Sequence, residues 1–176
     1  MIVKILDPTV QPEPAQASLA KRERGLDGKV LGLLANGKVN GDHLLALVRE
    51  ELLARYDVRD VVVMAKPGAS VTADDATLEA LASRCDAVVT AIGDLGSCST
   101  CSLHDGIELE RRGVPTAVIC TDQFIASAKA QAAICGNPDY PFVVVPHPIG
   151  SLTPGELRER AKTAAPQVID ILTREA

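Results

Sequence analysis

Hydrophobic residues along the chain occur in short, almost continuous runs rather than in alternation with polar residues. The runs are rich in β-branched side chains and lie at Val30–Ala35, Asp60–Ala65, Ala87–Ile92, Thr116–Thr121 and Phe142–Pro146. Continuous apolar runs of this length are typical of strands that are buried on both faces of a sheet. We therefore expect five strands at the centre of the fold.

Segments with the spacing of amphipathic helices separate these runs. The expected helices are Asp42–Arg55, Thr72–Arg84, Ser102–Arg112, Asp122–Ile134 and Pro154–Arg174. Strands that alternate with helices imply right-handed crossovers, which place successive strands parallel. The pattern therefore predicts an α/β fold: a three-layer, doubly wound, mostly parallel sheet of about five strands, flavodoxin-like in outline.

Residues near the helix ends support these boundaries. Thr72, followed three residues later by an aspartate, is a candidate N-terminal cap. Thr153 and Glu156 form a capping box around Pro154, which takes the first helical position that proline favours. Pro166 lies inside the last helix, and we expect it to kink or break that helix because proline lacks a backbone N–H group.

The first residues of the chain follow neither pattern. Their hydrophobic residues show little periodicity, and prolines recur at Pro8, Pro12 and Pro14. We predict an extended N-terminal arm over residues 1–28 and a single α/β domain over residues 29–176. The arm is either solvated or a strap across a partner subunit. The second alternative would explain why a segment this long has no structure of its own.

Composition narrows the class of partner. Aromatic residues make up only 2% of the chain and tryptophan is absent, so the core must be aliphatic, and the stacking platforms of single-stranded nucleic-acid binders are missing. A net charge of −5 without a basic patch makes nucleic acid and anionic membranes poor partners. No apolar run approaches the roughly 20 residues of a membrane span.

Cysteine usage indicates the compartment. The chain has five cysteines, an odd number, and its N-terminus lacks the long apolar segment of a signal peptide. We therefore expect free thiols and a cytoplasmic protein. Cys85 and Cys135 fall at helix ends or connections, and we interpret both as structural.

Polar or sulfur-containing residues follow the carboxyl end of every predicted strand. The residues at the amino ends of the strands, such as Arg59–Asp60 and Cys85–Asp86, show no comparable gathering of functional groups. Ligands of open parallel sheets bind outside the carboxyl ends of the strands. The sequence thus predicts a site at that edge. The candidates for substrate binding are Asn36, Lys66, Ser97, Asp122 and His147.

The strongest chemical candidates lie after the third strand. Cys98 falls near the start of a helix, where the partial positive charge of the helix end stabilises a thiolate. Cys101, three residues later, could meet it across the first turn. We predict Cys98 as a nucleophile, Cys101 as an assisting or resolving thiol and Asp94 as a group that handles protons. The alternative is that these small residues pack a tight turn.

Two further residues extend the list of catalytic candidates. His104 would share a helix face with Cys98 and Cys101, as a base, an ion-pair partner or a surface histidine. Three such residues could also hold a structural zinc ion, but the second pair of ligands that zinc sites usually use is missing. Cys120 ends a buried strand and is either a packed thiol or a second active-site thiol. We predict no metal and no cofactor, with zinc as the alternative.

The segment Gly93–Cys98 resembles the UGSC-motif (seleno)protein family, which is named for a tetrad of selenocysteine or cysteine, Gly, Ser and Cys. The resemblance extends over most of the chain, through Ile5–Thr9, Leu31–Lys38, Ser102–Gly106, Val118–Asp122 and Val143–Pro148. More distantly, the pattern is similar to the selenoprotein B component of glycine, sarcosine and betaine reductases.

Leu95 departs from the family pattern. The resemblance implies a selenolate or thiolate at this position, with Cys98 as its redox partner, and leucine can neither attack a substrate nor form a disulfide. Either Cys98 and Cys101 have taken over as the pair, or the chemistry is not redox, or the chain is an inactive subunit beside an active one.

These observations lead to two main functional hypotheses, beside a third class of function, a metal or thiol trafficking protein. The first is a thiol-dependent enzyme that acts on a small anionic metabolite by lyase, transferase or reductase chemistry. The second is a non-catalytic or co-catalytic subunit of a heteromeric enzyme, which pairs through the N-terminal arm. Both imply a homo- or hetero-oligomer without nucleic acid or membrane partners.

Overall fold

The computed structural model describes residues 18–173. A five-stranded, all-parallel sheet in the order β2-β1-β3-β4-β5 forms the middle layer. Its strands are β1 (Val30–Ala35), β2 (Asp60–Ala65), β3 (Ala87–Gly93), β4 (Thr116–Thr121) and β5 (Val143–Val145). The predicted three-layer α/β fold is therefore confirmed.

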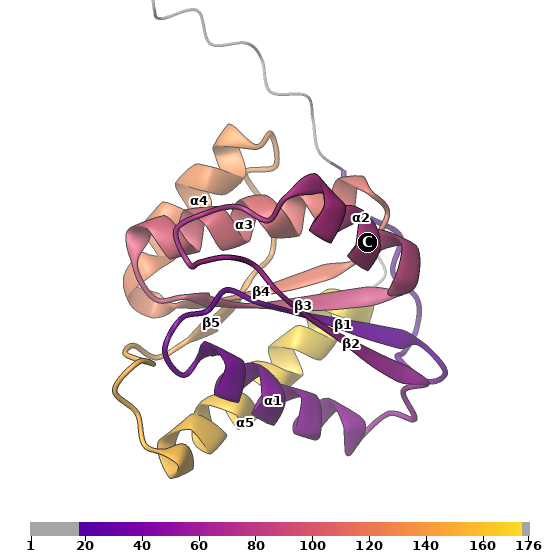
Figure 1. Cartoon of the computed structure of the whole chain (residues 1–176), viewed down its shortest axis with the longest axis horizontal. Helices are drawn as coiled ribbons and strands as arrows, with labels where there is room; N and C mark the ends of the chain where they lie inside the picture. Colours follow the sequence, from indigo (N-terminus) through magenta and orange to yellow (C-terminus); the bar gives the residue numbers. More distant parts are fainter. Residues whose placement is uncertain (1–17, 174–176) are drawn as a thin grey trace, which may run out of the picture.

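Helices cover both faces of the sheet (Figure 1). One face carries α1 (Gly41–Leu53) and α5 (Pro154–Thr173), which pack against each other. The other face carries α2 (Asp75–Arg84), α3 (Gly96–Arg111) and α4 (Ile125–Ile134). A short 3₁₀ helix, η1 (Asp122–Phe124), precedes α4. None of the helices within residues 18–173 is long and apolar enough to cross a membrane.

The strands lie close to the predicted runs, but β2 differs in its burial. It was expected to be covered on both faces like the other strands. Instead it is the edge of the sheet, so that Asp60 and Val63 are exposed and only Val62 is fully buried. An apolar run therefore indicated a strand correctly without indicating how completely the helices cover its two faces.

Three helix predictions need correction. The cap of α2 is Asp74, which accepts a hydrogen bond from the Thr77 backbone N–H at 2.7 Å, and Thr72 lies outside the helix. Pro166 does not break α5, which continues through it. The buried face of α5 packs on the sheet both before and after this proline. Such tertiary packing supplies most of the stability of a helix in a protein, so the helix tolerates the lost hydrogen bond. The third correction concerns α3, which begins at Gly96 rather than Ser102.

Both sheet faces are filled by aliphatic side chains, as the scarcity of aromatics implied. One continuous cluster joins α1 and α5 to the sheet, and two smaller clusters lie under α2 and under α3 and α4. The outer edge of β5 is closed by one side chain. Gln167 accepts a hydrogen bond from the Val144 backbone N–H at 3.0 Å and donates one to its carbonyl oxygen at 2.9 Å. Covering an edge strand is one of the ways in which proteins protect it from pairing with another strand.

Of the predicted N-terminal arm, residues 18–28 are described and pack on their own chain. Arg22 is buried, and its Nη2 lies 2.6 Å from Glu110 Oε1 on α3. Glu110 also accepts a hydrogen bond from the Ala20 backbone N–H at 2.6 Å. Leu26 is buried in the cluster beside α1 and α5. The rest of the arm, residues 1–17, lies outside the described residues.

Candidate functional site

The carboxyl ends of the strands lie together at the left of Figure 1, where the chain passes into α1, α3 and α5. Three of these ends bring chemically active side chains to one place. Asp94 and Cys98 follow β3, Thr121 ends β4, and His147 follows β5. The sequence predicted this edge, and the structure shows which of its residues face each other.

Cys98 is the third residue of α3. Its Sγ lies 3.2 Å from the backbone N of Asp94 and 3.0 Å from that of Leu95, and both N–H groups donate to it. This is the side-chain half of a capping box, with a sulfur where a carboxylate or amide is usual. Donors at a helix start bind a charged acceptor more strongly than a neutral one. The Cys98 thiol in turn donates to the Leu95 carbonyl oxygen at 3.3 Å, so the side chain is anchored by three contacts at the start of α3.

The exposure of Cys98 differs from what a reactive thiol at a sheet edge suggests. Its exposed fraction is 1%, whereas Leu95, three residues earlier, is 51% exposed. The position at which the resemblance places a selenocysteine or cysteine is therefore the open one, and Cys98 lies beneath it. The reason is local, since Leu95 is the extended residue before α3 and Cys98 points back under it as a cap.

His147 and Asp94 form a pair beside Cys98. Asp94 Oδ1 lies 2.9 Å from His147 Nδ1, and the Thr121 hydroxyl lies 3.2 Å from the same nitrogen. Asp94 is 5% exposed, and the His147 side chain 31%. The hydrogen bond of this nitrogen is with the Thr121 hydroxyl, whereas Asp94 Oδ1 approaches it without one and has no hydrogen-bond partner among the described residues. The same Asp94 thus contributes a backbone N–H to Cys98 and a carboxylate to His147.

The loop after β5 is held from two sides. The His147 backbone N–H donates to Asp122 Oδ1 at 3.1 Å, and the Phe124 ring meets the imidazole edge-on at 5.7 Å between centroids. Asn40, at the start of α1, donates from Nδ2 to the carbonyl oxygens of Ile149 and Leu152 at 3.0 and 3.1 Å. Asn40 has a φ of 64°, a conformation that asparagine tolerates better than most residues.

The other two thiols of this region differ in character. Burial raises the pKa of Cys101, and Lys66 acts in the opposite direction. Burial raises the pKa of Cys120 to about 12, so this thiol stays protonated at neutral pH. That value favours the packed-thiol alternative for Cys120. Cys120 also lies against Gly93, where an added Cβ would come within 2.5 Å of the sulfur.

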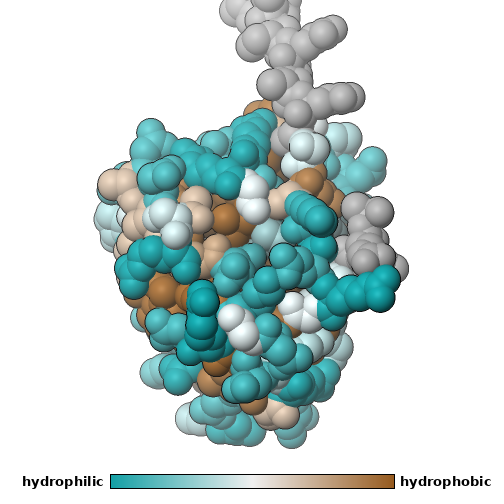
Figure 2. Space-filling view, turned by 90° about the vertical axis from the view of Figure 1, so that its right-hand side faces the viewer, coloured by the Kyte–Doolittle hydropathy of each residue, from teal (hydrophilic) through white to brown (hydrophobic). Residues whose placement is uncertain are grey.

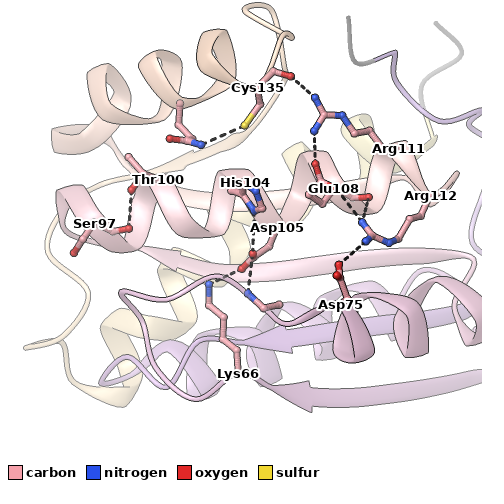
Figure 3. Close-up of polar contacts among 12 residues, drawn as sticks. Lys66, Asp75, Ser97, Thr100, His104, Asp105, Glu108, Arg111, Arg112 and Cys135 are labelled. Carbon is pink, nitrogen blue, oxygen red and sulfur yellow. Dashed lines mark hydrogen bonds and ion pairs between the residues drawn. The ribbon is translucent and has the colours of Figure 1, made fainter. Parts of the chain in front are cut away.

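A second polar group lies further along α3 (Figure 3). Lys66 Nζ lies 2.5 Å from Asp105 Oδ2, and both side chains are fully buried. Asp105 Oδ1 accepts the Ala73 backbone N–H at 2.9 Å, and His104 Nδ1 lies 3.6 Å from the same oxygen. The pair ties the loop after β2 to α3. Lys66 therefore offers no exposed ammonium to a substrate, contrary to the prediction.

Asn36 is likewise internal. Its exposed fraction is 0%, and Nδ2 donates to the Ile92 carbonyl oxygen at 2.9 Å. It joins the end of β1 to the end of β3 and does not face solvent. Among the predicted substrate-binding residues, those with exposed surface are Ser97, Asp122 and His147.

No group of three or more His, Cys, Asp and Glu side chains within residues 18–173 is arranged to hold a metal ion. Cys98, Cys101 and His104 form no such group. All five cysteines are free. The side chains described at this edge include a thiol, a carboxylate and an imidazole, those of Cys98, Asp94 and His147.

Sequence reasoning missed three residues of the site. Thr121 and Phe124 contact His147, and Asn40 holds the loop that follows it. Only Asn40 carried a usable signal, since asparagine before glycine is typical of turns with positive φ. The contacts of Thr121 and Phe124 depend on the pairing of β4 with β5, which no local pattern specifies.

The fold and this edge define a three-layer α/β protein with a thiol and a carboxylate–histidine pair where its strands end. Within that class, the chain belongs to the UGSC family, whose model matches residues 4–174. No curated protein and no solved structure matches the chain.

Proposed function

We propose that the chain is a thiol-dependent enzyme that acts on a small anionic metabolite, with Cys98 as the nucleophile. One observation carries the proposal. The Cys98 sulfur receives two backbone N–H groups at the start of α3, and the residue that supplies one of them, Asp94, also pairs with His147. A helix start and a neighbouring histidine are two of the features that activate cysteines in proteins.

The residues around Cys98 take distinct roles. His147 gives and takes protons, and Asp94 and Thr121 hold its ring. The free N–H groups of the first turn of α3, together with Ser97, bind the anionic group of the substrate. Cys101 assists as the second thiol. Lys66 and Asn36 position the loops and do not contact the substrate.

The covalent step forms a bond between Cys98 Sγ and an electrophilic carbon. The electron pair displaced from that carbon leaves with a departing group or takes a proton from His147. This chemistry suits a lyase or a transferase. It suits a reductase if the Cys101 thiolate then attacks Cys98 Sγ, the S–C bond breaks and the carbon takes a proton from His147; an external thiol would reduce the resulting Cys98–Cys101 disulfide. Because Cys98 is 1% exposed, the first turn of α3 with Leu95 has to move aside for the electrophile.

Alkylation kinetics test this proposal. With Cys101→Ser as background, Cys98 should react with iodoacetamide at least about tenfold faster than Cys135, a buried thiol that serves as an internal standard. His147→Gln should lower the Cys98 rate and leave the Cys135 rate unchanged. Peptide mass spectrometry gives both rates from one sample. Labelling of Cys135 or Cys85 with Cys98 unmodified would show that the site is wrongly assigned.

The exposed Leu95 favours a second candidate, a non-catalytic or co-catalytic subunit of a heteromeric enzyme. Its partner would be a paralogue with cysteine or selenocysteine at the Leu95 position. Size-exclusion chromatography of the chain alone and mixed with such a paralogue tests this candidate. A mixed complex that is active only when both chains are present would support it. For either candidate we propose a cytosolic location, which suits five free thiols.

A further inference from the structure

A cavity of about 310 Å³ lies at the edge of the sheet opposite to Cys98. It is lined by residues that directly precede the strands, among them Lys29 before β1, Asp86 before β3 and Pro115 before β4. Residues 21–26 of the N-terminal segment form another wall. Figure 2 looks onto this end of the molecule, where hydrophilic side chains predominate and hydrophobic atoms show between them.

The wall formed by the N-terminal segment is held by Arg22. Its guanidinium is paired with Glu110, and its Nε donates to the Ile171 carbonyl oxygen at 3.1 Å. Arg22 thereby joins the segment to both α3 and α5. Its neighbours in sequence, Lys21 and Glu23, line the cavity. A buried ion pair thus fixes the backbone between two charged residues that face the cavity.

The exposed surface of the cavity is mainly polar, with charged side chains of both signs around a smaller apolar floor. Lys21 and Lys29 are positive, and Glu23 and Asp86 are negative. Arg112 is also present, but it is engaged by Asp75 and Glu108. The floor consists of Leu26, Ala82, Ala87, Val114 and Leu172.

Part of this charge is exchangeable. Lys29 and Glu23 form an ion pair at the cavity, with 27% and 64% of their side chains exposed. Exposed pairs of this kind contribute little to stability. A ligand that carries both charges can therefore replace the pair and satisfy both residues at small cost. Asp86 accepts the Val30 backbone N–H with Oδ2, and an ionised carboxylate can accept further donors.

We propose that this cavity binds a zwitterionic metabolite of the amino-acid type. The carboxylate of the ligand meets Lys21 and Lys29, its ammonium group meets Glu23 and Asp86, and its hydrocarbon part covers the apolar floor. The volume of the cavity lies at the lower end of the range for small-molecule pockets. The site is independent of the proposed thiol chemistry, because it lies at the other end of every strand.

Ligand titrations monitored by NMR of the full chain test the proposal. L-leucine should bind, and N-acetyl-L-leucine and L-leucinamide, which each lack one charge, should bind at least about tenfold more weakly. Glu23→Gln and Lys29→Met should each weaken leucine binding by a similar factor. The shifted amide signals should belong to residues 21–29, 85–87 and 112–114.

The matched control is the exposed pair on α5, since Glu159→Gln and Lys162→Met remove the same kinds of group away from the cavity. These variants should bind leucine like the original chain. The proposal is overturned by absent binding at millimolar leucine, by equal binding of the two blocked compounds, or by shifts confined to the carboxyl edge. None of these results bears on the alkylation of Cys98, so the two proposals fail separately.

Discussion

Leu95 and Cys98 divide between them the two properties that a reactive thiol needs. Leu95 has the exposure, and Cys98 has the sulfur and the hydrogen-bond donors. Their separation by three residues at a helix start brings the backbone N of one within 3.0 Å of the Sγ of the other. A sulfur introduced at position 95 would therefore lie close to Cys98.

We predict that Leu95→Cys forms a disulfide with Cys98 under mild oxidation. The extended backbone of residue 95 and the first turn of α3 bring the two side chains together. Intact-mass measurement should show the loss of two hydrogens, and the linked peptide should contain both residues. Leu95→Cys combined with Cys98→Ser is the control and should keep its hydrogens. A link to Cys101 in place of Cys98 would contradict the geometry.

At the scale of elements, α3 shows why the start of a helix can be missed in the sequence. Its first turn consists of small residues with modest helix propensity, so periodicity did not reveal that it begins at Gly96. The turn forms because its side chains satisfy the backbone before it. Ser99 Oγ donates to the Leu95 carbonyl oxygen at 2.7 Å, and Cys98 accepts the N–H of the same residue. The helix start and the candidate site are therefore one structure.

Asn40 links another element, α1, to the loop that carries His147. We predict that Asn40→Gly, which tolerates the positive φ, and Asn40→Asp, which keeps the shape, both lose the donors to that loop. Each should lower the free energy of unfolding by about 1–2 kcal/mol. Both should also shift the ring proton signals of His147, measured by NMR. Loss of stability with unchanged His147 signals would show that Asn40 supports only the fold.

At the scale of the whole molecule, two groups of polar residues lie at opposite ends of the strands. Its carboxyl edge carries the thiol and the Asp94–His147 pair, and its amino edge carries the charged cavity closed by the N-terminal segment. Between them lies an aliphatic core that contains buried thiols and a buried tyrosine. Burial raises the pKa of Cys120 to about 12 and that of Tyr140 well above its ordinary value. Both groups therefore keep their protons to a higher pH in the folded chain than in the unfolded chain.

This difference predicts how stability depends on pH. As the pH rises above the ordinary pKa of a thiol, the unfolded chain loses the Cys120 proton first, so the free energy of unfolding falls until the folded pKa near 12 is reached. Cys120 contributes about 1.4 kcal/mol per pH unit in that interval. Urea unfolding at several alkaline pH values should show a shallower decline for Cys120→Ala. Parallel slopes would contradict the assignment.

The local patterns of the sequence were sufficient to predict the strands, the approximate helices and their order along the chain. Val30–Ala35, Asp60–Ala65 and Thr116–Thr121 are strands over those residues, because runs of β-branched residues and turn residues act over short distances. The edge that would carry the site also followed, since parallel strands all end on one side. Which side chains contact one another at that edge could not be predicted from the sequence.

Tertiary structure alone decided which polar groups face each other and which face water. Lys66 and Asp105 are 39 positions apart, and their burial as a pair depends on how the loop after β2 packs on α3. The contact of Asp94 with His147 depends on the order of β3, β4 and β5. The burial of Cys98 follows from the residue at which α3 begins. Periodicity reports which face of an element is apolar, whereas the direction of one polar side chain depends on neighbours that are distant in sequence.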